Sequence, residues 1–354
     1  MPAYVTCRFP FVDKWKDAAD KNPVLGFLDS LLSGYGQIGF NDNPVSGLLF
    51  IIGCFAGSLQ HGVASLVCAG TATLAAYLMG VPRLSLRLGL YTFNAALAGL
   101  GLALFVFPEQ GITATLILYE IMAGLLCVLL TAAFAGFLSR YQVPALALPY
   151  CTALMILIPA SLLLTRLNAS TAVIPYLAAP AGPAGGVWTA GAFFTAVMNN
   201  FAEILWQANV VSGVFVLLGL LAASRIDFLM AIIASVLASG AAILLGLPQE
   251  SNMLGIYGYN GVLLVLVLFG RGYAMSLRNF FFSLILSLGT VIITAWLQAL
   301  FAPLGVPVAA FPYVLVAILA LVSREALTGL RWVDPMKWGV PETIAKALKK
   351  ENKS

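Results

Sequence analysis

Two side chains that accept hydrogen bonds, Gln37 and Glu203, occupy equivalent places in a stretch that the chain contains twice. Apolar residues flank both, and amide and carboxylate oxygens are strong hydrogen-bond acceptors. An ionisable group within a membrane segment usually faces a solute pathway. We therefore expect both side chains to line a path for a solute that donates hydrogen bonds. For Glu203, the alternative is a carboxylate at the membrane interface, paired with an arginine or with water.

The repeat that relates these side chains has an offset of 166 residues, and it runs without gaps for about sixty positions. Identical residues recur along it at Asn43/Asn209, Ser46/Ser212, Gly80/Gly246, Pro82/Pro248, Tyr91/Tyr257, Asn94/Asn260 and Leu97/Leu263. The pairs Phe40/Trp206 and Phe93/Tyr259 keep an aromatic ring while its identity changes. A self-match of this length at a fixed offset indicates an internal duplication.

The composition places this duplication in a membrane protein. The 354 residues are 61% hydrophobic and 9% charged, with a mean hydropathy of +0.98, whereas a soluble domain carries about 25% charged residues. Apolar runs of transmembrane length recur along the chain, so we expect an all-α polytopic membrane protein. The five cysteines show no CxxC spacing, and four lie in apolar runs, which favours small buried hydrophobes over ligands or disulfides.

The apolar runs divide the chain into two repeats of five spans. A polar, amphipathic N-terminus at 1–23, which we expect to lie at the membrane surface, precedes the first repeat at 24–165. An outer connecting loop at 166–189 leads to the second repeat at 190–328, and a cytoplasmic tail follows at 329–354. Each repeat begins with a half-helix that is too short to cross the membrane. The half-helices are expected at 24–40 and 190–206, and the spans at 45–60, 62–80, 88–106, 110–138, 147–165, 211–224, 229–247, 254–270, 279–301 and 311–328.

The charges of the predicted loops give the orientation. With both termini in the cytoplasm, basic residues collect in the inner loops and tail at Arg83, Arg87, Arg140, Arg225, Arg271, Arg278, Lys346, Lys349, Lys350 and Lys353. The outer loops hold Glu109, Glu250 and a single basic residue, Arg166. This is the positive-inside pattern, and because five is an odd number, the second repeat enters the membrane inverted. Inverted repeats are typical of transporters and channels, with the solute path near the midplane between the halves.

Each half closes on a segment with two prolines, at 143–150 and 306–313. A proline inside a helix removes a donor and frees the carbonyl four residues earlier, which here would be the oxygens of Ala145 and Val308. Irregular backbone at membrane depth persists where it is packed in protein or lines a wet cavity. Matching segments in both halves therefore favour a pore lining over an ordinary kink.

Four other polar residues in or beside apolar runs have competing interpretations. Asn94 and Asn260 suit interhelical hydrogen bonds about as well as solute contact. Glu120 is a weaker candidate for the path, because its span is long enough to leave it near an interface. His61 is the single histidine of the chain, and one imidazole alone does not make a metal site.

Several of these segments together resemble the urea transporter family. The similar residues are Gly36-Gln37 leading into Asn43-Pro44-Val45-Ser46-Gly47, then Tyr257-Gly258-Tyr259-Asn260-Gly261, and the two proline segments, which are similar to the family signature Leu-Pro-x-x-Thr-x-Pro-Phe. The match spans about 24–325. The resemblance implies two inverted five-helix repeats, each with a re-entrant half-helix, around a central pore in every protomer of a homotrimer.

The resemblance also implies roles for individual residues. By position, Gln37 and Glu203 would be the polar ends of the solute path. The aromatic slots and the leucines beside them would be Phe40, Phe93, Trp206, Tyr259, Leu97 and Leu263. The signature threonine is Ala147 in the first half and Ala310 in the second, so both hydroxyl groups in the middle of the pore are absent.

The chemistry of urea fits such a path. Urea is planar and neutral, so it suits acceptors along one edge of a pore and flat apolar walls against its faces. An undercompensated ionic charge at the midplane costs about 2.5–3.5 kcal/mol or more, whereas a neutral amide mainly needs its hydrogen bonds replaced. We therefore predict facilitative, channel-like passage of urea across the plasma membrane, the inner membrane of a bacterium.

Two alternatives stand beside this prediction. The first is a channel for a related small neutral solute, either a short-chain amide or ammonia. The second is an intramembrane enzyme, which is disfavoured because no nucleophile–base or metal cluster accompanies His61. The predicted partners are urea, the lipid bilayer and further copies of the chain. No cofactor, metal ion or nucleic acid is expected.

Overall fold

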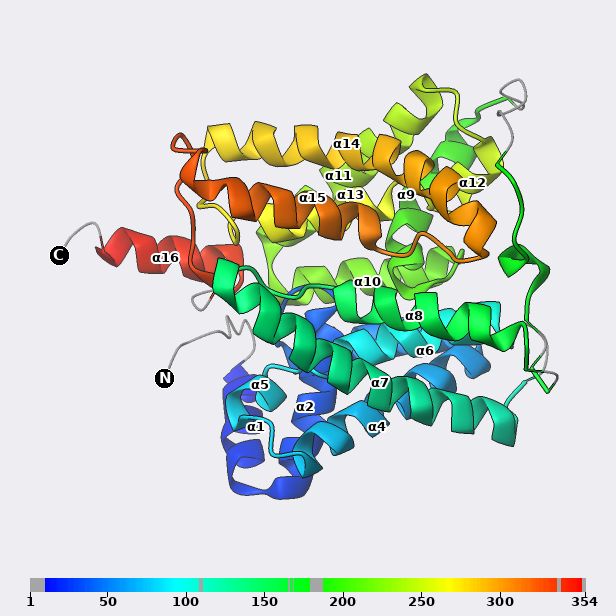
Figure 1. Cartoon of the computed structure of the whole chain (residues 1–354). Helices are drawn as coiled ribbons and strands as arrows, with labels where there is room; N and C mark the ends of the chain where they lie inside the picture. The colour runs from blue at the N-terminus through cyan, green and yellow to red at the C-terminus, as the bar shows by residue number, and fades with distance from the viewer. Residues whose placement is uncertain are drawn as a thin grey trace.

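The chain folds into a bundle of helices (Figure 1). The computed structural model describes residues 10–107, 111–164, 166–167, 169–178, 187–335 and 339–351. The helices of the first half are α1 (Pro10–Lys21), α2 (Pro23–Gln37), α3 (Pro44–Gly57), α4 (Leu59–Leu78), α5 (Arg83–Arg87), α6 (Phe93–Phe105), α7 (Ala114–Leu138) and α8 (Leu148–Ser161). Those that follow are α9 (Ala190–Ala202), α10 (Val210–Ala223), α11 (Arg225–Leu244), α12 (Gln249–Met253), α13 (Tyr259–Leu268), α14 (Leu277–Phe301), α15 (Phe311–Val322) and α16 (Pro341–Glu351). The predicted all-α fold class is confirmed.

The order of the helices repeats at the offset found in the sequence. Helices α3, α4, α5 and α6 begin 166 residues before α10, α11, α12 and α13, respectively. The offset then becomes 163 residues for the pairs α7/α14 and α8/α15. The half-helices expected at 24–40 and 190–206 correspond to α2 and α9. Helix boundaries in the two halves therefore follow the internal duplication.

The equivalent helices α3 and α10 pack against each other in antiparallel directions. Each begins at an asparagine cap, because the side chain of Asn43 or Asn209 accepts hydrogen bonds from the first-turn amides. The free amide group of Asn43 donates to the oxygen of Ala222 at 3.2 Å, in the last turn of α10. Asn209 donates to Ala56, in the last turn of α3, also at 3.2 Å. Asn43 and Asn209 are equivalent in the repeat, and so are Ala56 and Ala222, so the two hydrogen bonds are equivalent to each other.

Helices α6 and α13 are shorter than the spans predicted there, at 88–106 and 254–270. Each follows a turn with a left-handed glycine, Gly89 at φ 71° and Gly255 at φ 88°. A Cβ on Gly89 would lie 2.2 Å from a backbone nitrogen of α2, and one on Gly255 would lie 2.3 Å from a backbone oxygen of α9. A right-handed helix cannot run through such residues. The close contact with the half-helices therefore sets where both spans begin.

Four helices of the described residues, α4, α7, α11 and α14, are long and apolar enough to cross a membrane alone. Helices α9 and α10 would add a fifth span as a pair bent by 74°. Helices α3, α6, α8 and α13 are shorter apolar helices. The outer faces of α7 and α14 expose Leu118, Leu129, Ile285 and Ile292, which suits contact with lipid. A helical membrane protein accounts for these features.

Helix α1 packs onto the half-helix α2 through one face. Val12 and Ala19 of α1 are buried. The indole nitrogen of Trp15 donates to the carboxylate of Asp29 at 2.6 Å, and the ammonium group of Lys16 lies 3.1 Å from the same carboxylate. The location of this segment at the membrane surface stays a prediction. The sequence pattern did not predict that α1 contacts α2.

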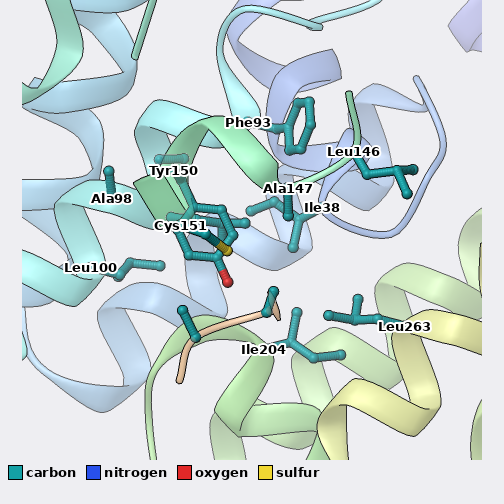
Figure 2. Packing of buried hydrophobic residues seen from close by; sticks show 14 of the residues in the cluster. Ile38, Phe93, Ala98, Leu100, Leu146, Ala147, Tyr150, Cys151, Ile204 and Leu263 are labelled. Atoms are coloured by element: carbon teal, nitrogen blue, oxygen red, sulfur yellow. The ribbon is translucent and has the colours of Figure 1, made fainter. Parts of the chain in front are cut away.

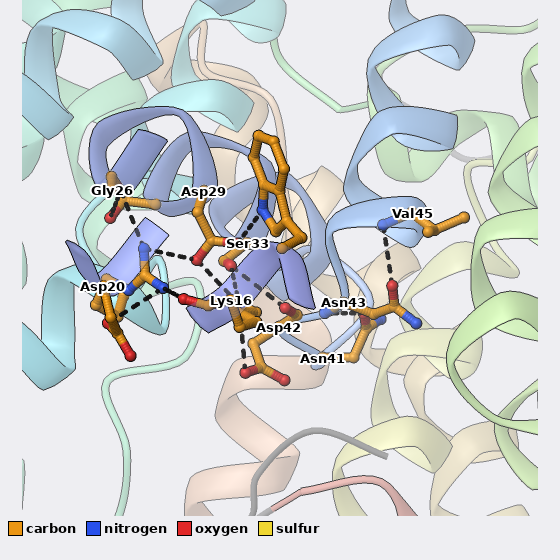
Figure 3. A network of polar contacts seen from close by, with 12 residues as sticks. Lys16, Asp20, Gly26, Asp29, Ser33, Asn41, Asp42, Asn43 and Val45 are labelled. Carbon is orange, nitrogen blue, oxygen red and sulfur yellow. Dashed lines mark hydrogen bonds and ion pairs between the residues drawn. The ribbon is translucent and has the colours of Figure 1, made fainter. Parts of the chain in front are cut away.

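The carboxylate of Asp29 is the centre of a network of charges (Figure 3). The side chain of Asp29 is fully buried in α2, and the guanidinium group of Arg87 lies 3.1 Å from it. Lys16 lies 3.8 Å from Asp42, in the turn after α2. A buried carboxylate needs paired charges and hydrogen bonds, so this network fixes the N-terminal helix to the first half-helix.

Candidate permeation pathway

The two predicted acceptors lie where the half-helices end. Gln37 is the last residue of α2, and Glu203 begins the 3-10 turn η3 (Glu203–Leu205) that extends α9. Three residues after each acceptor, the backbone of that half has a left-handed residue, Phe40 at φ 58° in the first half and Trp206 at φ 57° in the second. That conformation costs a residue with a side chain about 1–2 kcal/mol, yet both halves adopt it at the same place. The backbone therefore takes the same turn after each acceptor in the two halves.

The two proline segments lead into helices instead of interrupting them. Helix α8 begins at Leu148 and α15 at Phe311, and each has its proline in the first turn, where no intrahelical donor is lost. The expected release of two carbonyl groups is therefore wrong. The oxygen of Ala145 accepts the N–H of Leu148 at 3.2 Å, and the oxygen of Val308 accepts that of Phe311 at 3.4 Å.

A buried asparagine fixes each proline segment. The amide nitrogen of Asn94 donates to the oxygen of Leu146 at 3.2 Å, and its oxygen accepts the N–H of Tyr150 at 3.2 Å. Asn260 makes the same two bonds, at 3.4 and 3.2 Å, to the equivalent residues of the second segment. The bound carbonyls belong to Leu146 and Ala309, which are left-handed with φ of 50° and 49°. Interhelical hydrogen bonding is thus confirmed for both asparagines.

A wide cavity of about 500 Å³ opens where several predicted inner loops meet. Its lining residues come from within 37–42, 84–94, 131–146, 334–339 and from Arg271. Three of the predicted path residues, Gln37, Phe40 and Phe93, are among them. The volume lies in the range of small-molecule sites, so the cavity can admit a small solute together with water.

Past Gln37, Phe40 and Phe93, which line both spaces, the wide cavity gives way to a narrow one of about 10 Å³. That is about the room that a single water molecule needs. We call this narrow space the constriction. Its lining residues are Gln37, Ile38, Phe40, Phe93, Leu97, Ala147, Tyr150, Ile204, Tyr259, Leu263, Ala310 and Tyr313.

Residues of both halves line the constriction. Five pairs of repeat-related residues account for most of it, namely Ile38/Ile204, Phe93/Tyr259, Leu97/Leu263, Ala147/Ala310 and Tyr150/Tyr313. Figure 2 shows Ile38 and Ala147 from the first half above Ile204 and Leu263 from the second. The constriction therefore lies between the halves, and the structure brings eight of the ten predicted path residues to it.

The comparison with known proteins gives the family. The sequence model of the urea transporter family matches residues 28–325, which include every lining residue of the constriction. The chain belongs to the urea transporter family. It is 26% identical to urea transporter 1 of Ovis aries over 306 residues, which are 85% of this chain and 78% of that protein. It is also 26% identical to urea transporter 1 of Mus musculus over 322 residues, 90% of this chain and 82% of the relative. Facilitated passage of urea is the activity that this membership assigns.

Two predicted path residues of this family member, Glu203 and Trp206, line neither of the two cavities described here. The ring of Trp206 is buried and meets Phe105 edge to face, with 5.3 Å between ring centroids. Glu203 is half-buried, and its carboxylate lies within electrostatic range of the phenol of Tyr259. The aromatic slots, with the rings of Phe40 and Trp206 and those of Phe93 and Tyr259 expected to face each other across the path, stay a prediction. The ring of Phe40 instead meets Tyr313 edge to face at 6.2 Å.

The weaker candidates lie away from the constriction. Glu120 of α7 is fully buried, and no described residue donates a hydrogen bond to its carboxyl oxygens. His61 has its Nδ1 atom 2.6 Å from the hydroxyl of Ser58, the cap of α4. The described residues contain no group of three side chains that could hold a metal ion. The cysteines of the apolar runs are buried and free, as expected, at Cys54, Cys68, Cys127 and Cys151.

Sequence reasoning missed two kinds of residue that line the cavities of this urea transporter family member. Tyr150 and Tyr313 line the constriction, and their signal was the recurrence of a tyrosine at the end of both proline segments. Arg271, expected as an inner-loop charge, is buried and pairs with Asp227 at 2.7 Å while also lining the wide cavity. Nothing in the sequence near Arg271 pointed to a carboxylate so far away along the chain.

Proposed function

We propose that urea crosses the membrane through the wide cavity and the constriction, in single file between the two halves of the chain. The observation that carries this proposal is the lining of the constriction, which takes equivalent residues from both halves. A path between two related halves is the arrangement expected of a transporter built from inverted repeats. The constriction is smaller than urea, so passage requires the leucine and aromatic side chains that line it to rotate.

The lining suits a planar neutral solute. Phe40, Phe93, Leu97 and Leu263 offer flat apolar surface, against which the faces of urea can lie. The side-chain oxygen of Gln37 can accept an N–H group at the mouth that faces the wide cavity. A hydrated ion finds no compensating charge in the constriction and meets a barrier of about 2.5–3.5 kcal/mol or more. Several weak contacts in a row favour release over retention.

The proposal includes two repeats, 24–165 and 190–328, with opposite orientations in the membrane. Support comes from α3 and α10, which are equivalent helices that run antiparallel and exchange matching hydrogen bonds. The equivalent short helices α5 and α12 lie at opposite ends of the molecule, with α1 and α16 at the end of α5 (Figure 1). In this arrangement Gln37 faces the cytoplasmic side, and Glu203 belongs to the opposite mouth.

The proposed location is the plasma membrane, the inner membrane of a bacterium, with both termini in the cytoplasm. The support is the positive-inside distribution of arginine and lysine in the loops and tail. A homotrimer with one pore in each protomer is the assembly that the family resemblance favours. The outer connecting loop, expected at 166–189, lies in part outside the described residues, as does Glu109.

Stopped-flow light scattering of liposomes that contain the purified protein tests the proposed function. Urea should cross these liposomes several-fold faster than protein-free liposomes, while glycerol, a neutral solute that is not planar, should cross both at similar rates. Side-by-side runs with acetamide and ammonia separate the alternatives. Equal urea permeability with and without protein would contradict the proposal, and ammonia flux without urea flux would favour an ammonia channel.

A further inference from the structure

The constriction is apolar apart from a few side chains. Among its lining residues, the amide of Gln37 and the hydroxyl groups of three tyrosines are the polar side-chain groups, and the tyrosines are Tyr150, Tyr259 and Tyr313. The phenols of the three tyrosines lie within electrostatic range of one another. Any hydrogen bond that a solute makes to a side chain in the middle of the constriction therefore involves this group of phenols.

The three hydroxyl groups differ in the partners that they have within the protein. Tyr259 donates its hydroxyl hydrogen to the backbone oxygen of Ala309, which Asn260 also binds. Its role is thus to hold the second proline segment in place. The phenol of Tyr313 forms a hydrogen bond with the backbone of Ala147 in the other half, and the phenol of Tyr150 forms one with the thiol of Cys151. Neither donates to a carbonyl of the described residues, so each phenol can still contact a solute.

Tyr150 and Tyr313 are also equivalents of each other. Each is the third residue of its helix, α8 or α15, directly after the proline, and each has its backbone N–H bound by the asparagine of its own half. Both side chains are almost fully buried from bulk water and line the constriction. The backbone of each tyrosine is therefore fixed from behind, which presets the direction of its ring.

The proline segments differ from the family signature at three positions in each half. Val143 and Val306 replace its leucine, which exchanges one apolar side chain for another, and the other two changes involve hydroxyl groups. Ala147 and Ala310 stand where the signature has threonine, and Tyr150 and Tyr313 stand where it has phenylalanine. Each segment therefore lacks one hydroxyl group and has another three residues later. All four residues line the constriction, so both changes alter the same space.

We propose that Tyr150 and Tyr313 form the hydrogen-bonding site in the middle of the constriction, with the role that hydroxyl groups at positions 147 and 310 would otherwise have. The ligand class is a small planar amide with a carbonyl oxygen and at least one N–H group. This inference rests on the proposed function and adds the residues that select the solute.

The chemistry of a phenol allows both kinds of contact. A phenol has one hydrogen to donate and lone pairs that accept. One tyrosine can donate to the carbonyl oxygen of urea while the other accepts an N–H group from it, so the pair recognises both ends of an amide. Neutral hydrogen bonds of this kind are modest, which keeps the site weak enough to release the solute.

Urea flux through variants that lose only the hydroxyl groups tests this inference. Tyr150→Phe and Tyr313→Phe should each slow urea flux in liposomes by about two- to twelve-fold, and the double variant should be slower than either. Tyr119→Phe is the matched control, because that hydroxyl donates to the backbone oxygen of Leu157 and lies outside the constriction. Its flux should equal that of the parent protein.

A rescue variant separates loss of a hydroxyl group from a disturbance of packing. In the Tyr313→Phe background, Ala147→Thr returns a hydroxyl group beside the place that the phenol has left, and it should restore most of the lost flux. Failure of this rescue would overturn the inference, as would parental flux through a double Phe variant that unfolds at the parental temperature. If the parent protein itself moves no urea, the proposed function fails, and this outcome is distinct from the other two.

Discussion

The two halves of the chain build similar backbone around the constriction and support it with different side chains. Each half has a left-handed aromatic residue after its half-helix and a proline segment held by an asparagine. The halves differ in the side chains that connect the half-helix to the long helix packed against it. The hydroxyl of Tyr35 lies 2.7 Å from that of Ser65, whereas the equivalent residues, Phe201 and Ala231, both lack a hydroxyl group.

A second difference is the element that provides the buried polar side chain beside the half-helix. In the first half this side chain is Thr92, directly before α6, and in the second half it is Asn200, on the half-helix α9 itself. Gly34 leaves room for Thr92, whose hydroxyl lies 2.8 Å from that of Thr73. In the second half, Asn200 fills the space over Gly258 and donates to a serine of α11 at 2.8 Å. A buried polar group needs a partner, so such positions change in matched pairs. The backbone path is the shared part, and the packing behind it is particular to each half.

The strongest contrast between the halves is a buried ion pair in the second. Arg271 and Asp227 form two hydrogen bonds of 2.7 Å and are almost fully buried. The equivalent positions of the first half hold Phe105 and His61. The first half instead pairs the buried carboxylate of Asp29 with the half-buried charges of Lys16 and Arg87, beside α1.

Breaking the buried ion pair should have the largest effect on stability. Arg271→Leu leaves the carboxylate of Asp227 buried without its partner, which costs about 3–5 kcal/mol. Denaturant unfolding in detergent micelles measures the loss. The control is Arg83→Ala, because Arg83 pairs with Asp20 in an exposed position and such pairs contribute about 0–1 kcal/mol. Equal losses for the two variants would contradict a special role for the second half's pair.

Glu203 and Gln37 are the proposed acceptors at the two mouths of the path, and variants of Glu203 test whether the mouth of the second half uses a charged acceptor. If Glu203 serves as an acceptor, Glu203→Gln should keep much of the urea flux, because an acceptor oxygen remains. Glu203→Leu should lose about ten-fold or more, since a hydrogen bond to a charged acceptor contributes about 1.5–3 kcal/mol. Parental flux through Glu203→Leu in liposomes would make this residue structural and remove it from the path.

The two asparagines test whether the halves depend equally on their shared parts. Asn94→Ala leaves the carbonyl of Leu146 and the N–H of Tyr150 without a partner. Asn260→Ala leaves the N–H of Tyr313 without one, while Tyr259 still donates to the carbonyl of Ala309. A buried group that loses its partner costs about 1–3 kcal/mol. We expect a drop in unfolding free energy for both variants, and the larger one for Asn94→Ala, because two buried groups lose their partner there. A neutral result for one of them would show that its proline segment is held by other contacts, and the equivalence of the halves would fail there.

The smallest effect concerns Tyr35 and Ser65, the pair that the second half lacks. Ser65→Ala leaves the hydroxyl of Tyr35 buried without its partner, while Tyr35→Phe leaves Ser65 bonded to the oxygen of Ala96. The double variant copies the second half and should be less destabilised than the sum of the singles, by about 0.5–1.5 kcal/mol. Strict additivity in a double-mutant cycle would show that the two hydroxyl groups do not interact.

Much of this fold could be predicted because apolar runs and a fixed repeat constrain helices strongly. The half-helix ending at Gln37 and its counterpart at Glu203 followed from the apolar runs and the repeat. The eight predicted residues that line the constriction came mainly from the family resemblance, which assigns roles by position. The hydrogen bonds of Asn94 and Asn260 were one of two interpretations, and the geometry decided between them.

The rest depended on contacts between residues far apart in the sequence. The pairing of Asp227 with Arg271 joins α11 to the turn after α13, and no local pattern encodes it. The sequence predicts that the prolines of α8 and α15 interrupt helices, because sequence alone does not reveal where the first turn begins. Trp206 packs on Phe105 of the other half, and a repeat comparison within the chain cannot detect a contact that the halves do not share.

The central claim is that urea passes through the constriction between the halves, and urea flux through occluded variants tests it most directly. Ala147 and Ala310 line the constriction from opposite halves. Ala147→Leu and Ala310→Leu should each reduce urea permeability of liposomes to that of protein-free liposomes, with unfolding temperatures close to the parent's. Ala133→Leu, on the exposed face of α7, should transport urea at the parental rate. Parental urea flux through both folded constriction variants would contradict the account.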